Sequence, residues 1–313
     1  MTQVPLFTSR HVEVAVSPMR AVEAVRGAFV AHARGEWTMP PKVYVTNYPA
    51  GDFRAMPALG GGHALLKWVT SFPGNPARNL PTVTGVVLLS NADTGELEAV
   101  LDAASVTALR TGAAAVLAAE TLGRSDARSA AVVGAGVNGA AAAATFVERG
   151  RDVTVWDVDG ERAQRVAGDL GASVAGSLDE ALAADLLVTV TPGHEVLLVD
   201  GALRPGQHVS LMGADGPGKA EIAPGELARA HVFCDDWEQA SHGGELAAVV
   251  HAGLIDEHDV TRVGDVLGGT ALGRASEGEI TAFDSTGLAI QDLAIAIAAY
   301  ERRSELDLPT IEL

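Results

Sequence analysis

The sequence predicts an α/β protein in which a doubly wound parallel sheet is inserted into a discontinuous α+β domain. Three observations lead to this fold class. Residues 1–123 mix helix-like and strand-like segments, residues 124–288 alternate short apolar strands with helices, and residues 289–313 return to a helix. We therefore assign residues 1–123 and 289–313 to one domain and residues 124–288 to a second.

The first part of the chain begins with a helical pattern and continues with strand-like segments. Apolar residues recur at helical spacing over 18–36. Apolar runs over 42–48 and 64–72 predict strands, and 82–102 predicts a β-hairpin with the turn NADTG. A long helix is predicted over 105–123.

From about residue 128 the sequence alternates between strands and helices. The strand segments are SAAVVGAG, DVTVWD, DLLVTVTP, GQHVSLMGAD and AHVFCDD. Short buried strands that alternate with helices are typical of a parallel sheet. The final stretch, SEGEITAFDSTGLAIQDLAIAIAAYERRSE, predicts a strand, a glycine turn and a helix that packs on the first part of the chain.

The composition limits the classes of partner. The 313 residues include 22 basic and 40 acidic side chains, a formal net charge of −18, and no block of basic residues, so neither nucleic acid nor an anionic membrane surface is expected as a partner. The one cysteine, Cys234, cannot form an intrachain disulfide. No signal peptide or membrane span is recognisable, so a cytoplasmic location is expected. No spacing of histidine and cysteine indicates a metal site.

The basic residues single out one lysine. Only Lys42, Lys67 and Lys219 are lysines, and Lys67 interrupts the apolar run ALLKWV. Burying an unpaired ammonium is costly, but a desolvated ammonium can give up its proton, which arginine cannot do. We predict that Lys67 takes part in proton transfer. A lysine placed there by chance is the alternative at this point.

The segment VVGAGVNG contains the pattern G-x-G-x-x-G as Gly134, Gly136 and Gly139. It follows a predicted strand and opens an alanine-rich helix. Such glycines allow a tight turn and a close approach of the backbone to a pyrophosphate at the helix N-terminus. Together with Val137 and Asn138, they predict a dinucleotide site of the Rossmann type.

The acid that ends the next strand indicates which dinucleotide binds. Asp157 follows the last glycine by 18 residues, where a carboxylate accepts hydrogen bonds from ribose hydroxyls and repels a 2′-phosphate. The nearby Arg162 and Arg165 weaken this preference, because a guanidinium attracts a 2′-phosphate. NAD is therefore the expected cofactor, and NADP is less favoured. Thr191 and Pro192 end a later strand and are expected to line the cofactor, unless they only form a strand-to-loop turn.

Two further charged residues suit hydride transfer on a substrate acid. Arg110 lies in the predicted helix SVTALRTGAAA, and its guanidinium can bind a carboxylate through two hydrogen bonds. A salt bridge on a solvated helix face is the alternative. Asp215 follows a predicted strand in GADGPGK and is a candidate general acid or base. A turn-forming aspartate is the alternative there.

Five segments resemble, in order along the chain, the ornithine cyclodeaminase/mu-crystallin family. They are KWVTSFPGNP, LPTVTGVVLLSNADTGELEAVLDAASVTALRTGAAAVLAAETLG, VVGAGVNG, GADGPGKAEI and FDSTGLAIQDLA. The resemblance covers most of the chain. It implies a Rossmann domain inserted into a substrate-binding domain that also joins two copies into a homodimer.

The resemblance also implies roles for individual residues. The matches to catalytic residues are Lys67 and Asp215, and the matches to substrate-binding residues are Lys42, Met56, Lys67 and Arg110. Lys42 stands where the family usually has an arginine, so it offers a cation without the guanidinium fork. The matches to cofactor-binding residues are Thr82, Arg110, Gly134, Gly136, Val137, Asn138, Gly139, Asp157, Thr191, Met212, Gly213, Ala214, Lys219, Ser285 and Gly287.

The resemblance leaves three functions open for a protein that takes a small amino or imino acid. In an imine reductase or amino acid dehydrogenase, Lys67 protonates an imine while NADH delivers hydride to its carbon. In ornithine cyclodeaminase, NAD is recycled and Asp215 handles protons. A mu-crystallin-like protein only binds a ligand. We expect the first function, because KWVTSFPGNP is closer to the alanine dehydrogenase and imine-reductase branches. The complete set of Lys67, Arg110 and Asp215 argues against lost catalysis.

Overall fold

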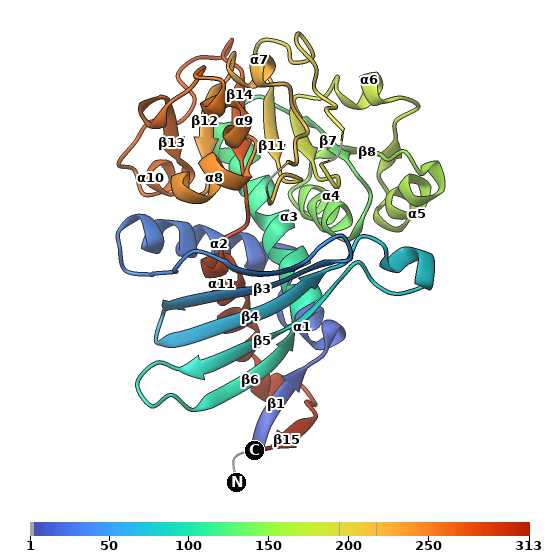
Figure 1. Cartoon of the computed structure of the whole chain (residues 1–313). Helices are drawn as coiled ribbons and strands as arrows, with labels where there is room; N and C mark the ends of the chain where they lie inside the picture. Colours follow the sequence, from blue (N-terminus) through green and yellow to red (C-terminus); the bar gives the residue numbers. More distant parts are fainter. Residues whose placement is uncertain (1–2, 194, 217) are drawn as a thin grey trace. The chain divides into compact units, whose positions relative to one another are not determined.

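The computed structural model describes residues 3–193, 195–216 and 218–313. The chain divides into two compact units (Figure 1). Unit 1 comprises Met1–Arg110 and Leu288–Leu313, and unit 2 comprises Thr111–Gly287. The inserted parallel sheet that the sequence predicts is therefore present in unit 2, and the discontinuous domain in unit 1.

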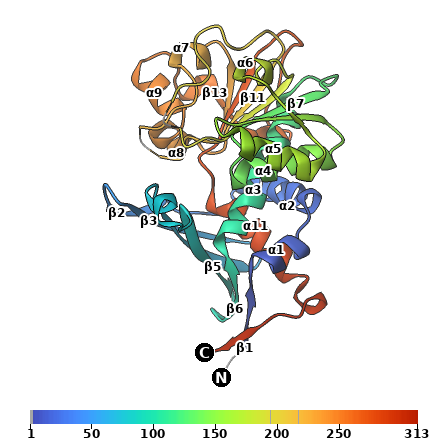
Figure 2. The ribbon, with the colours of Figure 1, turned by 90° about the vertical axis from the view of Figure 1, so that its right-hand side faces the viewer.

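Unit 1 is built on a seven-stranded sheet in the order β15-β1-β6-β5-β4-β3-β2. Neighbouring strands run antiparallel except β1 and β6, which are parallel. Figures 1 and 2 show β1 and β15 side by side at one edge of this sheet, where they pair antiparallel. The strands are β1 Gln3–Phe7, β2 Val43–Asn47, β3 Gly51–Gly60, β4 His63–Ser71, β5 Val83–Asn91, β6 Leu97–Asp102 and β15 Thr310–Glu312.

The strand register gives the sheet of unit 1 two different faces. On the inner face, Met56, Lys67 and Val87 align across β3, β4 and β5, and all three are buried. On the outer face, Trp68 aligns with Val86, and both are exposed. Successive side chains of a strand point to opposite faces, so the position of Lys67 in β4 places it on the inner face.

Helices cover the inner face. Figure 2 shows α1, α2 and α11 gathered on one side of this sheet, and α11 packs against α2, β3, β4 and β5. The prediction that the last helix packs on the first part of the chain is therefore confirmed. The helices are α1 Ser9–Ala15, α2 Pro18–Ala33 and α11 Ala289–Tyr300, with short 3₁₀ turns at Asn75–Arg78 and Arg303–Glu305.

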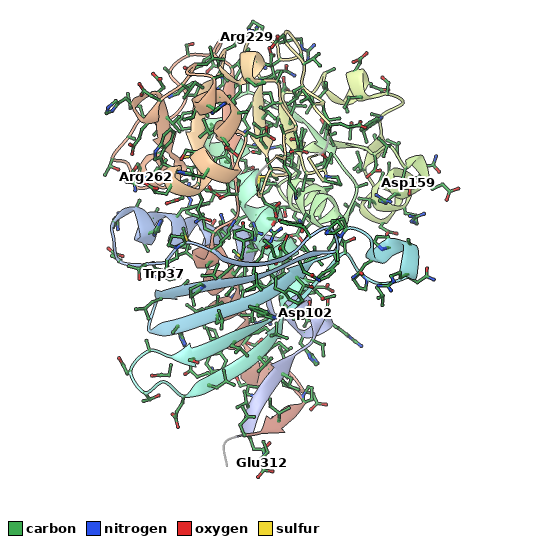
Figure 3. All side chains as sticks on the ribbon, viewed as in Figure 1. Trp37, Asp102, Asp159, Arg229, Arg262 and Glu312 are labelled. Carbon is green, nitrogen blue, oxygen red and sulfur yellow. The ribbon has the colours of Figure 1, made fainter. Side chains whose placement is uncertain are left out.

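Helix α3, Ala103–Leu122, begins in unit 1 and ends in unit 2. Asp102, labelled in Figure 3, accepts hydrogen bonds from the amide and hydroxyl of Ser105 and so caps its first turn. Further along, Ser210 donates a hydrogen bond to the carbonyl of Ala115 within unit 2. The structural division at Arg110 therefore falls inside this helix, whereas the sequence places the boundary after it, at residue 123.

Unit 2 is built on an eight-stranded parallel sheet in the order β13-β12-β14-β11-β10-β7-β8-β9. The order reverses direction at β7, so the fold is doubly wound, as predicted. The strands are β7 Ser129–Val133, β8 Asp152–Trp156, β9 Ser173–Val174, β10 Leu186–Thr189, β11 His208–Leu211, β12 His231–Cys234, β13 Val260–Arg262 and β14 Thr281–Asp284. The helices are α4 Val137–Glu148, α5 Gly160–Leu170, α6 Leu178–Ala181, α7 Pro224–Leu227, α8 Trp237–Gly243, α9 Leu246–His251 and α10 Val263–Leu267, with a 3₁₀ turn at Glu257–Asp259.

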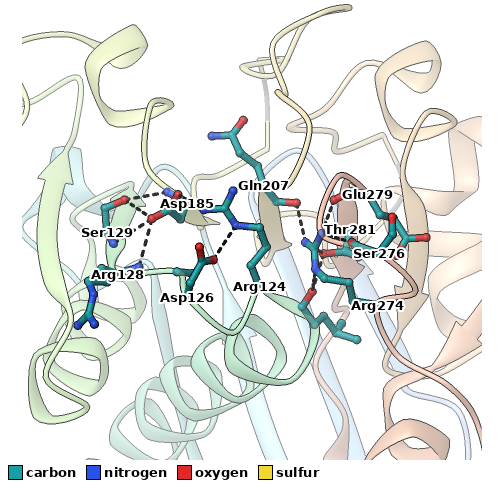
Figure 4. Close-up of polar contacts among 12 residues, drawn as sticks. Arg124, Asp126, Arg128, Ser129, Asp185, Gln207, Arg274, Ser276, Glu279 and Thr281 are labelled. Atoms are coloured by element: carbon teal, nitrogen blue, oxygen red, sulfur yellow. Dashed lines mark hydrogen bonds and ion pairs between the residues drawn. The ribbon is translucent and has the colours of Figure 1, made fainter.

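A polar network closes the amino ends of the parallel strands (Figure 4). Arg274 donates to the carbonyl of Gln207 and to the hydroxyl of Thr281, at 3.1 and 2.9 Å. Asp185 accepts from Arg124 at 3.2 Å and from the hydroxyl of Ser129 at 2.9 Å. These contacts occupy the amino edge with structural bonds, while ligands of such sheets bind at the carboxyl edge.

Over the described ranges, the structure contains no helix of the length and apolarity that a bilayer span requires. Within those same ranges it also contains no group of three His, Cys, Asp or Glu side chains placed to hold a metal ion.

Candidate active site

Lys67 is a buried lysine with a buried partner. Its side chain is almost fully enclosed, with 1% of its surface exposed, and its Nζ lies 2.7 Å from Asp292 Oδ2. The same Nζ donates to the hydroxyl of Thr107 at 3.3 Å. Strand β4 places the lysine on the inner face, and helices α11 and α3 supply the two partners. A buried ammonium is tolerated because this carboxylate pairs with it.

Other cations surround the same carboxylate. Arg110 Nε lies 3.5 Å from Asp292 Oδ1, and Arg110 Nη1 donates to Gln291 Oε1 at 3.4 Å. The pKa of Lys67 is lowered to about 8, mainly by burial; Asp292 opposes this shift, and the charges of Arg110 and Lys42 contribute to it. Two cations, Lys67 and Arg110, therefore share one buried acid, Asp292.

The wall beside Lys67 is apolar. Met56 lies directly opposite Lys67 in the β3–β4 pairing and is 4% exposed. The structure therefore brings together the predicted residues Lys67, Met56 and Arg110, with the charge of Lys42 acting on the same lysine.

Sequence reasoning missed Asp292 and Gln291. Both are fully buried in α11, inside the apolar segment LAIQDLAIAIAA. The signal was available, because two adjacent polar residues in an apolar helix need partners when the helix is buried. It could not show that the partners would come from β4 and α3.

In unit 2, the three glycines of the dinucleotide motif serve different purposes. A Cβ on Gly134 would lie 2.7 Å from the carbonyl oxygen of Val190, and one on Gly139 would lie 1.8 Å from the carbonyl oxygen of Gly134. A Cβ on Gly136, by contrast, would meet no atom within 4 Å. The first two are therefore required by packing, and Gly136 leaves open space at the start of α4.

The N-terminus of α4 suits a pyrophosphate. Gly136 is its N-cap residue and provides no side-chain hydrogen bond to the first turn, and Val137 in that turn is 71% exposed. Backbone N–H groups at such an end, together with the helix dipole, favour a bound anion. This part of the chain therefore fits the pyrophosphate of NAD.

Asp157 connects the end of β8 to the glycine turn. Its Oδ2 accepts from the amide of Ala135 at 2.7 Å, and its Oδ1 accepts from the amide of Asp159 at 2.8 Å. Each carboxylate oxygen has a second lone pair for a further donor. Arg162 lies 3.6 Å from Asp157 and 3.2 Å from Asp159, so its guanidinium is paired with both acids. Arg165 faces Glu161 at 4.0 Å.

The remaining predicted residues of unit 2 follow the carboxyl ends of β10, β11 and β14. Asp215 Oδ1 accepts from Lys219 Nζ at 2.6 Å. The Met212 amide donates to the carbonyl of Thr189 at 2.8 Å, and the Ser285 hydroxyl donates to Asp235 at 2.9 Å. The other members of this group are Thr191, Gly213, Ala214 and Gly287, while Asn138 lies in the first turn of α4, after β7.

Two of the predicted cofactor-binding residues do not belong to unit 2. Thr82 precedes β5, and its carbonyl accepts a hydrogen bond from the amide of Phe72 at 2.8 Å. Arg110 lies in the cation cluster described above. For both residues, the cofactor role stays a prediction.

Comparison with known proteins gives a consistent result over the whole chain. The family model described as "Ornithine cyclodeaminase/mu-crystallin family" matches residues 4–307. The alanine dehydrogenase of Archaeoglobus fulgidus is 41% identical over 304 residues, which is 95% of this chain and 94% of that protein.

Solved structures agree with the sequence relatives. An archaeal alanine dehydrogenase dimer with bound NAD has a TM-score of 0.94 at 40% identity, and the match covers 100% of both chains. The iminosuccinate reductase of Paracoccus denitrificans, in complex with NAD⁺, has a TM-score of 0.91 at 28% identity and the same full coverage.

Proposed function

Because the chain belongs to the ornithine cyclodeaminase/mu-crystallin family, we propose that it is an NAD(H)-dependent oxidoreductase. It transfers hydride at the carbon of the C–N bond in a small amino or imino acid. One observation carries this proposal beyond the family: the cluster of Lys67 and Arg110 around the buried Asp292. Its excess positive charge is suited to the carboxylate of such a substrate.

The residues of unit 1 receive the substrate roles. Arg110 binds the carboxylate, because a guanidinium offers two parallel donors to two oxygens. Lys67 donates a proton at the substrate nitrogen, and its pKa of about 8 suits proton transfer near neutral pH in both directions. Asp292 holds the ammonium in place through the 2.7 Å contact. Bound NADH supplies the hydride.

The residues of unit 2 receive the cofactor roles. The first turn of α4 binds the pyrophosphate, and the remaining lone pairs of Asp157 accept from the ribose hydroxyls. The same carboxylate disfavours a 2′-phosphate, which supports NAD over NADP. Asp215 is assigned as a second acid or base, and its Oδ1 accepts a hydrogen bond from Lys219 Nζ at 2.6 Å.

The apolar side chain of Met56 opposite Lys67 favours a substrate with a small side chain. A diamino acid such as ornithine needs an acceptor for its second ammonium, and Met56, directly opposite Lys67, offers none of comparable strength. This supports an alanine-type amino acid dehydrogenase or an imine reductase over a cyclodeaminase. The 41% identity to an alanine dehydrogenase supports the same choice.

A substrate panel tests the proposal. The protein is incubated with NAD⁺ and L-alanine or L-aspartate, with NADH and pyrroline-2-carboxylate, and with NAD⁺ and ornithine. A net change in NADH absorbance in the first or second set supports the oxidoreductase. Ammonia and proline without net absorbance change would instead establish a cyclodeaminase. Cofactor binding without turnover of any substrate would indicate a ligand-binding protein.

The proposal includes a cytoplasmic homodimer that forms through the outer face of the unit 1 sheet. Leu66, Trp68, Val86, Val43 and Val45 share this face by strand register, and each is at least one third exposed. Apolar surface of this extent on one face is typical of a protein interface. The archaeal alanine dehydrogenase dimer supports a second copy as the partner.

A further inference from the structure

Glu221 is a fully buried carboxylate that the assigned roles leave unused. Its Oε1 accepts from the amide and the hydroxyl of Thr191, both at 2.7 Å. Its Oε2 accepts from the hydroxyl of Thr189 at 2.7 Å and from the amide of Gly213 at 2.9 Å. One side chain thus connects the loop after β10 with the loop after β11.

Two further observations show that the backbone around the Glu221 carboxylate is closely packed and fixed in place. A Cβ on Gly213 would lie 2.4 Å from Glu221 Cδ, so glycine at this position leaves room for the carboxylate. The amide of Glu221 itself donates to Glu245 at 2.7 Å, which fixes the chain that carries it. In the pattern G-A-D-G-P-G-K-A-E, the first residue, Gly213, therefore makes room for the carboxylate of the last, Glu221, and donates a hydrogen bond to it.

We propose that Glu221 is a positioning residue for the cofactor-binding edge of unit 2. It holds Thr191 and Gly213, and with Gly213 the segment that leads to Asp215, in one arrangement before the cofactor binds. The inference rests on the proposed function, because it concerns residues to which that function assigns cofactor contacts. A preformed arrangement improves affinity because less ordering is needed on binding.

The chemistry of the site requires a carboxylate rather than an amide. Each oxygen of Glu221 faces one backbone N–H, from Thr191 on one side and from Gly213 on the other. Glutamine has one oxygen and one NH₂ group, so in either orientation its NH₂ faces a backbone N–H. One loop therefore loses its bond and is pushed away.

The test compares Glu221→Gln with a matched control in the same unit. Glu226 is also fully buried, and its two oxygens also accept from backbone amides, those of Gly201 and Leu203, at 2.7 and 2.6 Å. Glu226→Gln introduces the same mismatch in a loop to which no cofactor role is assigned, and it also removes the ion pair of Glu226 with Arg229. The dissociation constant of NADH is measured by fluorescence titration, together with kcat, KM and Tm.

We expect both variants to lower Tm, but only Glu221→Gln to weaken NADH binding, by about tenfold. Equal NADH affinity and equal kcat in Glu221→Gln and Glu226→Gln, with a similar loss of Tm, would show that Glu221 is only structural. If the wild type itself bound no NADH, the proposed function would fail instead, so the two failures are distinguishable.

A milder variant covers the case in which Glu221→Gln does not fold. Thr189→Val keeps the shape of a buried side chain and removes one of the four donors to Glu221. We expect it to weaken NADH binding in the same direction by about threefold, since one neutral hydrogen bond is lost. Unchanged affinity in this variant would contradict the proposal.

Discussion

The two units of this protein stabilise buried charge in opposite ways. In unit 1, the buried Lys67 and the nearby Arg110 share one carboxylate, Asp292, and the cluster keeps an excess of positive charge. In unit 2, the buried Glu221 accepts hydrogen bonds from two backbone amides and two threonine hydroxyls. The first arrangement depends on ionisation, and the second depends on the direction of hydrogen bonds.

This difference indicates what each unit is suited to do. Ion pairs between titratable groups can exchange a proton with a substrate, and their state changes with pH. A carboxylate held by backbone amides instead fixes the loops that donate to it. Variants of Lys67 and Asp292 should therefore alter turnover and its pH dependence, while variants of Glu221 should alter cofactor binding.

The largest effect is expected for Lys67→Arg. Arginine keeps the positive charge beside Asp292 but does not release a proton at physiological pH. We expect kcat to fall by about a thousandfold, within the range for the loss of a general acid, with unchanged NADH affinity. Steady-state kinetics and a fluorescence titration check this. An active variant would contradict the proton-donor role of Lys67. It would also show that the ion pair of unit 1 has no role in turnover that the buried acid of unit 2 lacks.

Asp292→Asn is expected to have the next largest effect. Asp292 is the main group that raises the pKa of Lys67 against burial, so its loss should move that pKa below the present value of about 8. In the reductive direction Lys67 must be protonated, so the rate falls as pH rises through its pKa. The fall should therefore occur at lower pH in the variant, and pH–rate profiles measure the shift.

The control for this variant is Asp52→Asn. Asp52 is also a buried acid of unit 1, paired with Arg54 at 2.6 Å, but it has no assigned role toward Lys67. Removing one partner of a buried ion pair typically costs about 3–5 kcal/mol in the free energy of unfolding. We expect both variants to be destabilised, and the kinetic pKa to move in Asp292→Asn alone. A shift in both would show that the effect is not specific.

The pH dependence of stability provides a related check in the wild type. The pKa of Lys67 is about 8 in the folded protein and 10.5 without burial. Between these values the unfolded chain binds the proton and the folded chain does not. The contribution of Lys67 to the free energy of unfolding therefore rises with pH across this window. Denaturation of wild type and Lys67→Met at several pH values should reveal the difference.

Asp157→Ala should have a moderate effect, confined to the cofactor. Loss of the carboxylate removes acceptors for the ribose hydroxyls and frees Arg162 for a 2′-phosphate. We expect the preference for NAD over NADP to fall by about tenfold in kcat/KM. Asp159→Ala, which removes the other partner of Arg162 and the N-cap of α5 but leaves Asp157 in place, serves as the control. An unchanged preference in Asp157→Ala would show that the adenosine site is misassigned.

Trp68→Glu should have the smallest effect on the chemistry. A charge on the outer face of the unit 1 sheet should prevent self-association, while NADH affinity remains as in the wild type. Leu272→Glu is the control, since Leu272 is 86% exposed in unit 2. Light scattering measures the oligomeric state of both. A wild-type protein that is monomeric at working concentration would contradict the proposed dimer.

Much of the fold follows from local patterns. The helices over 18–36 and 105–123 and the strands of unit 2 other than the short β9 and β13 could be predicted, because apolar spacing and glycine motifs are local signals. Strand β3 was not predicted, although it pairs with Lys67 through Met56. Its segment GDFRAMPALG mixes charge, proline and glycine, and becomes a strand because β2 and β4 supply partners on both sides.

The candidate site could be predicted in part. Lys67, Arg110, Asp157 and the glycines carry chemical signals in their own segments. Asp292 could not be assigned from the sequence, because its role exists only once α11 packs on the inner face, 225 residues along the chain from Lys67. The role of Glu221 could not be assigned from the sequence either, because its donors lie in two loops, one after β10 and one after β11.

The sequence by itself therefore determined the class of the protein: an acidic α/β chain with a dinucleotide motif and one lysine in an apolar strand. Periodicity and local motifs suffice for this, because they act over a few residues. The tertiary structure decided which charges meet. Lys67 is tolerable in its strand because Asp292 reaches it, and the energy of a buried charge depends on partners that only packing brings within contact distance.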